Sequence, residues 1–119
     1  MKDQGWIGVD LDGTLAEYTH FRGLHDFGPP IPKMVERVKQ WIAEGKHVKI
    51  LTARVSQSLY RPTPEDVYRT VLAIQDWTEL HIGYRLPVTC IKDFAMIELW
   101  DDRAVQVIPN TGERADGKP

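Results

Sequence analysis

The sequence has a single cysteine, Cys90, in 119 residues. One cysteine cannot form an internal disulfide, and such scarcity is typical of proteins that stay in a reducing compartment. No apolar run approaches the roughly 18 residues that are needed to cross a bilayer. Residues 1–5 also lack the apolar core of a signal peptide. We therefore expect a cytoplasmic protein without a membrane partner.

An excess of basic residues is also missing. The formal net charge is −2 at pH 7 and the isoelectric point is near 6.1, so the composition gives no basic surface signal for nucleic acid. The length suits one hydrophobic core rather than two. The sequence contains no internal repeat and no low-complexity segment, which favours a single folded domain.

Two aspartates stand directly after the first apolar run of the chain. Residues 6–9 form a short run that ends at turn residues, which indicates a buried strand. The run leads into Asp10-Leu11-Asp12-Gly13-Thr14-Leu15, and alternation places Asp10 and Asp12 on the same side of an extended chain. Close carboxylates repel each other unless a cation lies between them or one carries a proton. Read alone, the same residues also fit an ordinary polar turn.

The rest of the chain alternates between strand and helix patterns. Helices are predicted from Pro32 to Gly45 and from Thr63 to near Gly83, because each has a suitable start, an apolar stripe and a glycine stop. Further strands are predicted at residues 48–51, 88–91, 95–100 and 104–108. This order predicts an α/β fold: a single Rossmann-like domain with a mostly parallel sheet flanked by helices. Residues 109–119 are predicted to form a polar tail.

Polar side chains follow the predicted strands. They are Asp10 and Asp12, then Thr52, then Lys92, then Asp101 and Asp102. Each has an ordinary explanation alone, as a helix cap, a solvated charge or a turn residue. The carboxyl ends of parallel strands, however, meet at one edge of a sheet. Together the residues favour phosphoryl transfer, because carboxylates suit Mg²⁺, hydroxyl and ammonium groups match phosphoryl oxygens, and a carboxylate nucleophile permits an aspartyl-phosphate intermediate.

These motifs resemble, in content and order, those of the haloacid dehalogenase superfamily, from residue 6 to about residue 108. The resemblance implies a hydrolase domain over residues 1–108, with Asp10 as nucleophile and Asp12 as general acid and base. It implies that Thr52 and Lys92 bind the phosphoryl oxygens. The implied magnesium ligands are Asp10, the main-chain carbonyl of Asp12, Asp101 and, directly or through water, Asp102.

Two details narrow this resemblance. Asp12 matches the second aspartate of the family's phosphatases, which the true dehalogenases lack. Neither usual insertion point has room for a cap domain, so the sequence resembles the small capless members, which have open sites. The resemblance therefore implies a Mg²⁺-dependent phosphatase that hydrolyses a phosphomonoester. One departure is the short spacing from Lys92 to Asp101, which leaves no helix between the last two strands of the motif set.

Residues 15–31, which we call the flap, show no clear periodicity. A loop of this length in a compact domain is usually functional. One interpretation is a lid that moves at Gly23 and Gly28, closes on the substrate and selects it. Its aromatic and cationic side chains suit stacking and phosphate pairing; they include Tyr18, Phe21, Arg22 and Phe27. The other interpretation is a fixed covering loop with its rings in the core.

Several alternatives stay open. A phosphotransferase, or a protein that binds Mg²⁺ and phosphate without turnover, fits the same residues. A phospho-accepting receiver domain fits less well, because receivers begin with an adjacent acidic pair, whereas here that pair comes last. The phosphorylated substrate could be a nucleotide, a sugar phosphate, a nucleic-acid end or a phosphoprotein.

Other reactive side chains receive ordinary interpretations. His20, His25 and Cys90 do not have the spacing of a standard zinc site, so they are interpreted as loop and core residues, with Cys90 in an apolar strand. The arginines near the motifs could contact the substrate, but each is interpreted as a surface charge; they are Arg22, Arg54, Arg61 and Arg103.

Overall fold

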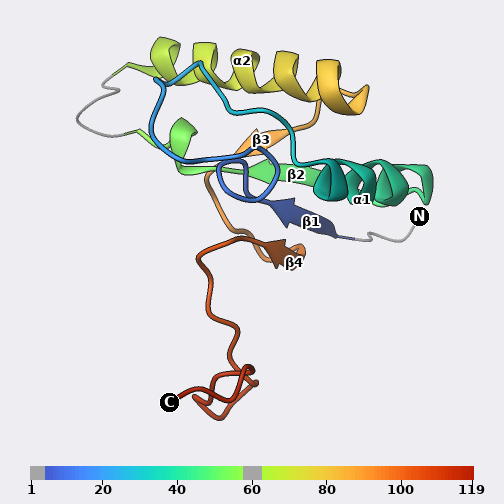
Figure 1. Ribbon diagram of the computed structural model, residues 1–119, viewed down its shortest axis with the longest axis vertical. Helices are drawn as coiled ribbons and strands as arrows, with labels where there is room; N and C mark the ends of the chain where they lie inside the picture. The colour runs from blue at the N-terminus through green and yellow to red at the C-terminus, as the bar shows by residue number, and fades with distance from the viewer. Residues whose placement is uncertain (1–4, 58–62) are drawn as a thin grey trace.

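The architecture is an all-parallel sheet with helices on one face. Figure 1 shows the computed structural model, which describes residues 5–57 and 63–119. In chain order the elements are β1 (Trp6–Val9), α1 (Pro32–Ala43), β2 (Val48–Leu51), the 3₁₀ turn η1 (Ala53–Val55), α2 (Pro64–Ile82), β3 (Val88–Thr89) and β4 (Met96–Trp100). The predicted α/β, Rossmann-like fold class is confirmed, and every strand pair in the described sheet is parallel.

The strand order is β3-β2-β1-β4. The chain runs outward from β1 through β2 to β3, and it then returns to the other side of β1 to form β4. Val9, at the end of β1, is therefore paired with both Ile50 and Trp100. In open α/β sheets, ligands bind beyond the carboxyl ends of the strands where the strand order reverses. Here that position lies beyond β1 and β4.

Both helices begin and end close to the predicted residues. The Thr63 hydroxyl oxygen accepts a hydrogen bond from the Asp66 N–H at 3.2 Å, and Pro64 opens α2. Gly83 ends α2 with a φ of 97°, a left-handed conformation that glycine adopts without strain. None of the helices within residues 5–57 and 63–119 has both the length and the apolar character of a membrane span.

The hydrophobic core lies between the sheet and the two helices. Ile7 and Val9 alternate with residues of the opposite face, so their side chains enter this core together with those of β2. Buried apolar residues of both helices belong to this same core cluster. The buried partners include Val48, Ile50, Val35, Val38, Ile74 and Trp77. Burial of this cluster fixes the ends of β1 and β2, and so it fixes the position of the residues that follow.

The opposite face of the sheet has no helix in the described chain. Residues 90–95, which we call the strap, link β3 to β4 across this face. The Trp6 indole N–H donates to an Asp93 carboxylate oxygen at 2.8 Å, and the Trp6 backbone N–H donates to the Ala95 carbonyl at 3.0 Å. The Lys49 ammonium lies 4.7 Å from the Trp6 ring. The strap therefore covers Trp6 and ties β4 to β1.

Two strand predictions are wrong. β3 stops at Thr89, short of residue 91, and residues 104–108 do not form a strand of the sheet. Residues beyond β4 leave the body as an arm, visible in Figure 1, so no neighbouring strand is available for pairing. Within the arm, Val107 forms only an isolated antiparallel bridge with Arg114.

Candidate active site

A cavity of about 580 Å³ lies beyond the carboxyl ends of the strands. Its lining includes most of the predicted site residues, namely Asp10, Asp12, Thr52, Asp101 and Asp102. The flap contributes a second wall. The ends of the parallel strands therefore bring five of the six predicted side chains to one cavity, and Lys92 is the exception.

Three carboxylates form what we call the acidic cluster: Asp10, Asp101 and Asp102. One oxygen from each lies within 4.8 Å of the others. The Asp10 N–H donates to the Trp100 carbonyl at 2.9 Å, which joins the ends of β1 and β4. One Asp101 carboxylate oxygen accepts from the Arg103 N–H at 2.7 Å. The backbone thus holds two of the three residues in register.

The acidic cluster is electrostatically strained. Burial raises the pKa of Asp10 from 3.8 to about 7, and the negative charges of Asp101 and Asp102 add to the shift. Every side chain that contributes to this shift is acidic. Three converging carboxylates at a sheet edge are a donor set that suits a hard cation such as Mg²⁺, which takes oxygen ligands and keeps several waters. The residues present therefore fit the predicted metal.

Gly13 is required beside this cluster. Its φ is +88°, which other residues rarely adopt, and a Cβ atom at this position would collide with the Asp102 carboxylate. The Thr14 hydroxyl donates to the same carboxylate at 3.4 Å. The Gly-Thr step after the two aspartates therefore makes room for Asp102 and orients it.

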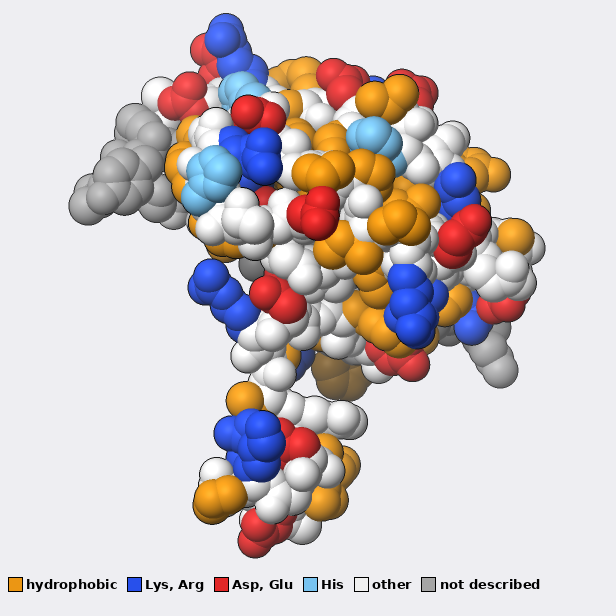
Figure 2. All heavy atoms as spheres, viewed as in Figure 1, with side chains coloured by type: hydrophobic (Ala, Val, Ile, Leu, Met, Phe, Trp, Pro, Cys, Tyr) orange, Lys and Arg blue, Asp and Glu red, His pale blue; other side chains and the backbone are white. Residues whose placement is uncertain are grey.

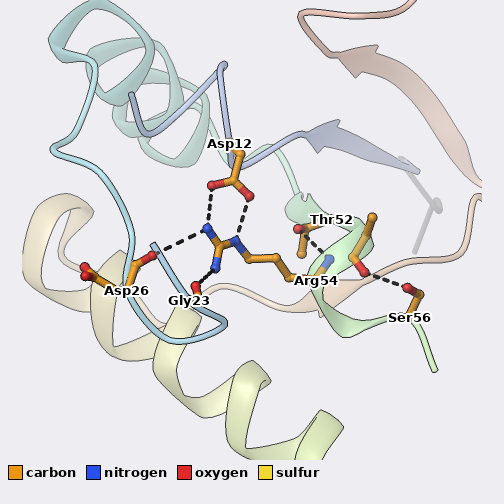
Figure 3. Close-up of polar contacts among 7 residues, drawn as sticks. Asp12, Gly23, Asp26, Thr52, Arg54 and Ser56 are labelled. Atoms are coloured by element: carbon orange, nitrogen blue, oxygen red, sulfur yellow. Dashed lines mark hydrogen bonds and ion pairs between the residues drawn. The ribbon is translucent and has the colours of Figure 1, made fainter. Parts of the chain in front are cut away.

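Asp12 lies apart from the acidic cluster and forms an ion pair with Arg54. Arg54 Nε donates to Asp12 Oδ2 at 2.7 Å, and Arg54 Nη2 donates to Asp12 Oδ1 at 2.9 Å, as Figure 3 shows. This two-pronged geometry is the strong form of an arginine–carboxylate pair. The charge of Asp12 is therefore balanced by an ion pair, whereas no ion pair of the described residues involves Asp10, Asp101 or Asp102.

Arg54 also binds the flap. Its guanidinium donates to the carbonyl oxygens of Gly23 and Asp26, and its Cζ lies 5.4 Å from the Phe21 ring centroid and 4.8 Å from that of Phe27. Arg54 is only 7% exposed. The interpretation of Arg54 as a surface charge is therefore wrong: it joins η1, the Asp12 turn and the flap.

Thr52 has two roles in the structure. Its side-chain oxygen accepts from the Arg54 N–H at 3.1 Å, so it caps η1. It is also buried and lines the cavity. The hydroxyl oxygen is used as an acceptor in this cap, which leaves its hydrogen available to donate to a bound oxygen.

Lys92 is exposed and is not among the described residues that line the cavity. The reason is the early end of β3, because Lys92 lies on the strap, three residues after Thr89, and not at the strand end. Cys90 precedes it; the prediction that Cys90 is buried in a strand is wrong, since its thiol is exposed and Cys90 lines the cavity.

The remaining candidates have ordinary positions or lie outside the described chain. His20 contacts the Thr19 hydroxyl at 3.0 Å in the exposed flap. Arg22 and Arg103 are exposed, and Arg103 lines the cavity. Arg61 lies outside the described residues.

The flap is anchored along its length. The Glu17 N–H donates to the Pro29 carbonyl at 2.9 Å and closes its base. Gly28 lies so close to the Glu17 carbonyl that a Cβ atom would collide with it. Farther out, His25 Nε2 forms a 3.1 Å hydrogen bond with the Thr70 hydroxyl of α2. These contacts, together with Arg54, favour a fixed wall over a hinged lid.

A solved structure with a similar fold is that of a conserved protein from Bacteroides thetaiotaomicron. It is 20% identical in sequence, with a TM-score of 0.56 over 89% of this chain and 82% of that chain. At this identity the similarity shows the fold alone. No family model matches the sequence, and no curated protein matches it either.

Proposed function

We propose that the protein is a Mg²⁺-dependent phosphatase of the capless haloacid dehalogenase type, acting on a phosphomonoester. The observation that carries the proposal is the acidic cluster. It lies where the strand order reverses, beside the cavity and the buried Thr52 hydroxyl. Converging carboxylates suit a cation and a phosphate, because the cation offsets the negative charges of both.

Asp10 is the proposed nucleophile. One of its carboxylate oxygens attacks phosphorus, the bond to the leaving oxygen breaks, and an aspartyl-phosphate forms on Asp10. The Thr52 hydroxyl donates to a phosphoryl oxygen and orients the group. A bound Mg²⁺, held by Asp10 and Asp101 with Asp102 directly or through water, would supply neutralisation of phosphoryl charge.

Asp12 is the proposed acid and base, and its ion pair favours one of these roles. Both carboxylate oxygens accept hydrogen bonds from Arg54, so this arrangement suits the removal of a proton from the water that hydrolyses the aspartyl-phosphate. Donation of a proton to the leaving group requires Asp12 to turn away from Arg54. We therefore assign the illustrated geometry to the second, hydrolytic step.

The position of Lys92 favours a second candidate, a protein that binds Mg²⁺ and phosphate without turnover. In the family that the sequence resembles, this lysine would contact the phosphoryl group, yet here it is exposed outside the cavity lining. Arg54 and Arg103 are the cationic side chains of the described lining. A phosphotransferase would use the same Asp10 chemistry with an acceptor other than water.

We place this reaction in the cytoplasm, because the sequence has one cysteine and that thiol is exposed. Figure 2 shows basic side chains interspersed with acidic ones on the visible face, without a continuous basic patch. This distribution supports a small phosphorylated substrate more than a nucleic-acid strand.

The test compares Asp10→Asn with Asp76→Asn, a matched change at an exposed aspartate of α2. With Mg²⁺ and an aryl phosphate, we expect Asp10→Asn to reduce kcat by about a thousandfold or more, as loss of a nucleophile does, and Asp76→Asn to have no effect. Thermal melts check that both variants fold. Near-normal turnover by Asp10→Asn would exclude the covalent mechanism, and Mg²⁺-dependent phosphate binding by an inactive native protein would favour the second candidate.

A further inference from the structure

The cavity is much larger than a phosphate group needs. Its volume of about 580 Å³ lies within the range of sites that enclose small organic ligands. Asp10 and Thr52 define the end at which we place the phosphoryl group. The rest of the cavity is therefore available for the leaving group, and its lining indicates the chemistry of that group.

The flap wall of the cavity presents two aromatic rings to solvent. Tyr18 is 41% exposed and Phe21 is 57% exposed, and both line the cavity. Phe27, from the same flap, instead packs against the hydrophobic core. The interpretation of the flap rings as core residues therefore holds for Phe27 and fails for the other two. Large apolar groups left exposed in a concave site commonly mark a ligand contact.

Contacts with other residues of the protein hold the Phe21 ring in place. Its ring lies 5.4 Å from the Arg54 guanidinium, which is itself fixed by both oxygens of Asp12 and by the Gly23 carbonyl. The flap that carries Phe21 is tied down at its base and to α2. A ring held in place before binding loses little freedom when a ligand stacks on it, so such a wall improves affinity.

We propose that the flap is a preformed stacking wall for a nucleobase, and that the substrate is a nucleoside monophosphate. This inference rests on the proposed phosphatase function. Exposed aromatic rings stack on bases of any sequence because every base has a π-face, while the phosphate lies against Asp10 and Thr52. Arg103, in the same lining, takes part in none of the ion pairs of the described residues and adds a cation for stacking or pairing. A free nucleotide is favoured over a nucleic-acid end, because a formal net charge of −2 gives the chain no excess of basic residues to bind a strand.

The first experiment compares three substrates of the native protein with Mg²⁺: adenosine 5′-monophosphate, ribose 5-phosphate, and an oligonucleotide with a 5′-phosphate. The first two share the ribose 5-phosphate unit, and the nucleotide carries adenine where the sugar phosphate has its anomeric hydroxyl. Because base–aromatic stacking contributes a measurable increment per base, we expect kcat/KM to favour the nucleotide by about tenfold or more. Equal rates for the first two would overturn the stacking wall and leave the phosphatase proposal intact. Faster hydrolysis of the oligonucleotide would overturn the assignment to a free nucleotide.

The second experiment removes the ring. Phe21→Leu keeps an apolar side chain, Phe21→Trp keeps a ring, and Tyr84→Leu changes a ring of similar exposure, 56%, outside the cavity lining. We expect Phe21→Leu to lose most of the preference for the nucleotide, because its kcat/KM should fall more on adenosine monophosphate than on ribose 5-phosphate. Phe21→Trp and Tyr84→Leu should keep the preference. An unchanged preference in Phe21→Leu, with a normal melting temperature, would overturn the proposal; if that variant melts early, Tyr18→Leu gives the same comparison.

A binding measurement separates failure of this inference from failure of the proposed function. Calorimetric titration of Asp10→Asn with adenosine monophosphate, and with ribose 5-phosphate, in the presence of Mg²⁺ needs no turnover. Tighter binding of the nucleotide that Phe21→Leu abolishes would support the stacking wall even if the native protein hydrolyses nothing. Equal affinities for the two ligands would overturn it even if the protein is an active phosphatase.

Discussion

Asp12 and the acidic cluster, which line the same cavity, differ in how their negative charge is balanced. Asp12 has its countercharge in the chain, because Arg54 binds both of its carboxylate oxygens and is itself buried. Asp10 has no such partner among the described residues: its acidic neighbours Asp101 and Asp102 raise its pKa further than burial alone does. Two aspartates that are separated by a single residue in the sequence therefore belong to regions of opposite electrostatic character.

The Asp12–Arg54 ion pair is complete without a ligand, whereas the acidic cluster needs a bound cation to offset its charge. The Asp12–Arg54 pair holds the flap in place without a ligand, and removal of either partner would leave a charge in a poorly hydrated position. The acidic cluster stores repulsion, which a divalent cation relieves. We expect changes in the first region to affect stability, and changes in the second to affect the response to metal and pH.

The largest expected effect on stability comes from Arg54→Met. Loss of the guanidinium leaves Asp12 and two flap carbonyls without their donors, so we expect the free energy of unfolding in urea to fall by about 3 kcal/mol or more. Tryptic cleavage after the exposed Arg22 should accelerate as the flap loosens. Arg85→Met, which removes an exposed arginine that pairs with Asp76, is the control and should change neither measurement appreciably.

A double variant sharpens this prediction. If the cost arises from an unpaired Asp12, Arg54→Met combined with Asp12→Asn should be more stable than Arg54→Met alone. If the double variant is less stable by the sum of the single effects, the pair does not couple the two residues.

The next effect is stabilisation by magnesium. A cation that binds only the folded protein should add about 2.7 kcal/mol at a hundredfold excess over its dissociation constant, seen as a higher Tm. Asp101→Asn should remove most of this increment, whereas Asp12→Asn should keep it, because the Asp12 carboxylate lies outside the acidic cluster. Equal losses in both variants would show that the two regions are not separate.

A smaller effect is the pH dependence of the metal-free protein. The folded pKa of Asp10, about 7, lies above its ordinary value of 3.8, so between these values the folded state holds a proton that the unfolded state has lost. Stability should therefore fall as pH rises through this window and level off above it. Urea midpoints at pH 5 and pH 8 measure the slope.

The control for this slope is Asp10→Asn. It should lose the contribution of Asp10 and leave every other titratable group in place, so the difference between the two proteins isolates one group. Saturating Mg²⁺ should reduce the slope in the native protein, because a bound cation favours the ionised carboxylate. A native slope identical to that of Asp10→Asn would contradict the raised pKa.

The smallest effect is expected from Lys92→Ala. Because Lys92 is exposed outside the cavity lining, we expect kcat/KM to change by no more than about twofold, as is usual for surface positions. The same assay on Thr52→Val, which removes a hydroxyl from the cavity, should show a greater loss. A large loss in Lys92→Ala would mean that the strap moves toward the bound phosphate.

The fold could be predicted from the sequence wherever the signal is local. β1, α1, α2 and β4 follow from short apolar runs, an apolar stripe at helical spacing, and end signals such as Thr63 and Gly83. The length of β3 and the fate of residues 104–108 depend on whether a neighbouring strand is present, which no local pattern records. The apolar residues of the arm match a strand pattern, but they extend beyond the edge of the sheet.

The candidate site was predictable where its residues directly follow a strand that local sequence signals predict. Asp10 and Asp101 follow well-predicted strands, and the parallel sheet brings them together. Lys92 was misplaced along with the end of β3. Arg54 was missed because its partner is 42 residues away, on a turn whose position depends on the flap. The available signal was its position. Arg54 lies two residues after Thr52, at the end of a strand that neighbours the one before Asp10 and Asp12.

The pairing of β4 with β1 has a consequence for folding kinetics. Thr14 and Asp102 are in contact although they are 88 positions apart in the sequence. The acidic cluster therefore forms only when nearly the whole chain has closed into one loop. Contacts of such sequence separation are slow to form. An early intermediate built from β1, α1, β2 and α2 would hold Asp12 and Arg54 but no cluster. Magnesium should therefore slow unfolding while leaving the first steps of refolding unchanged.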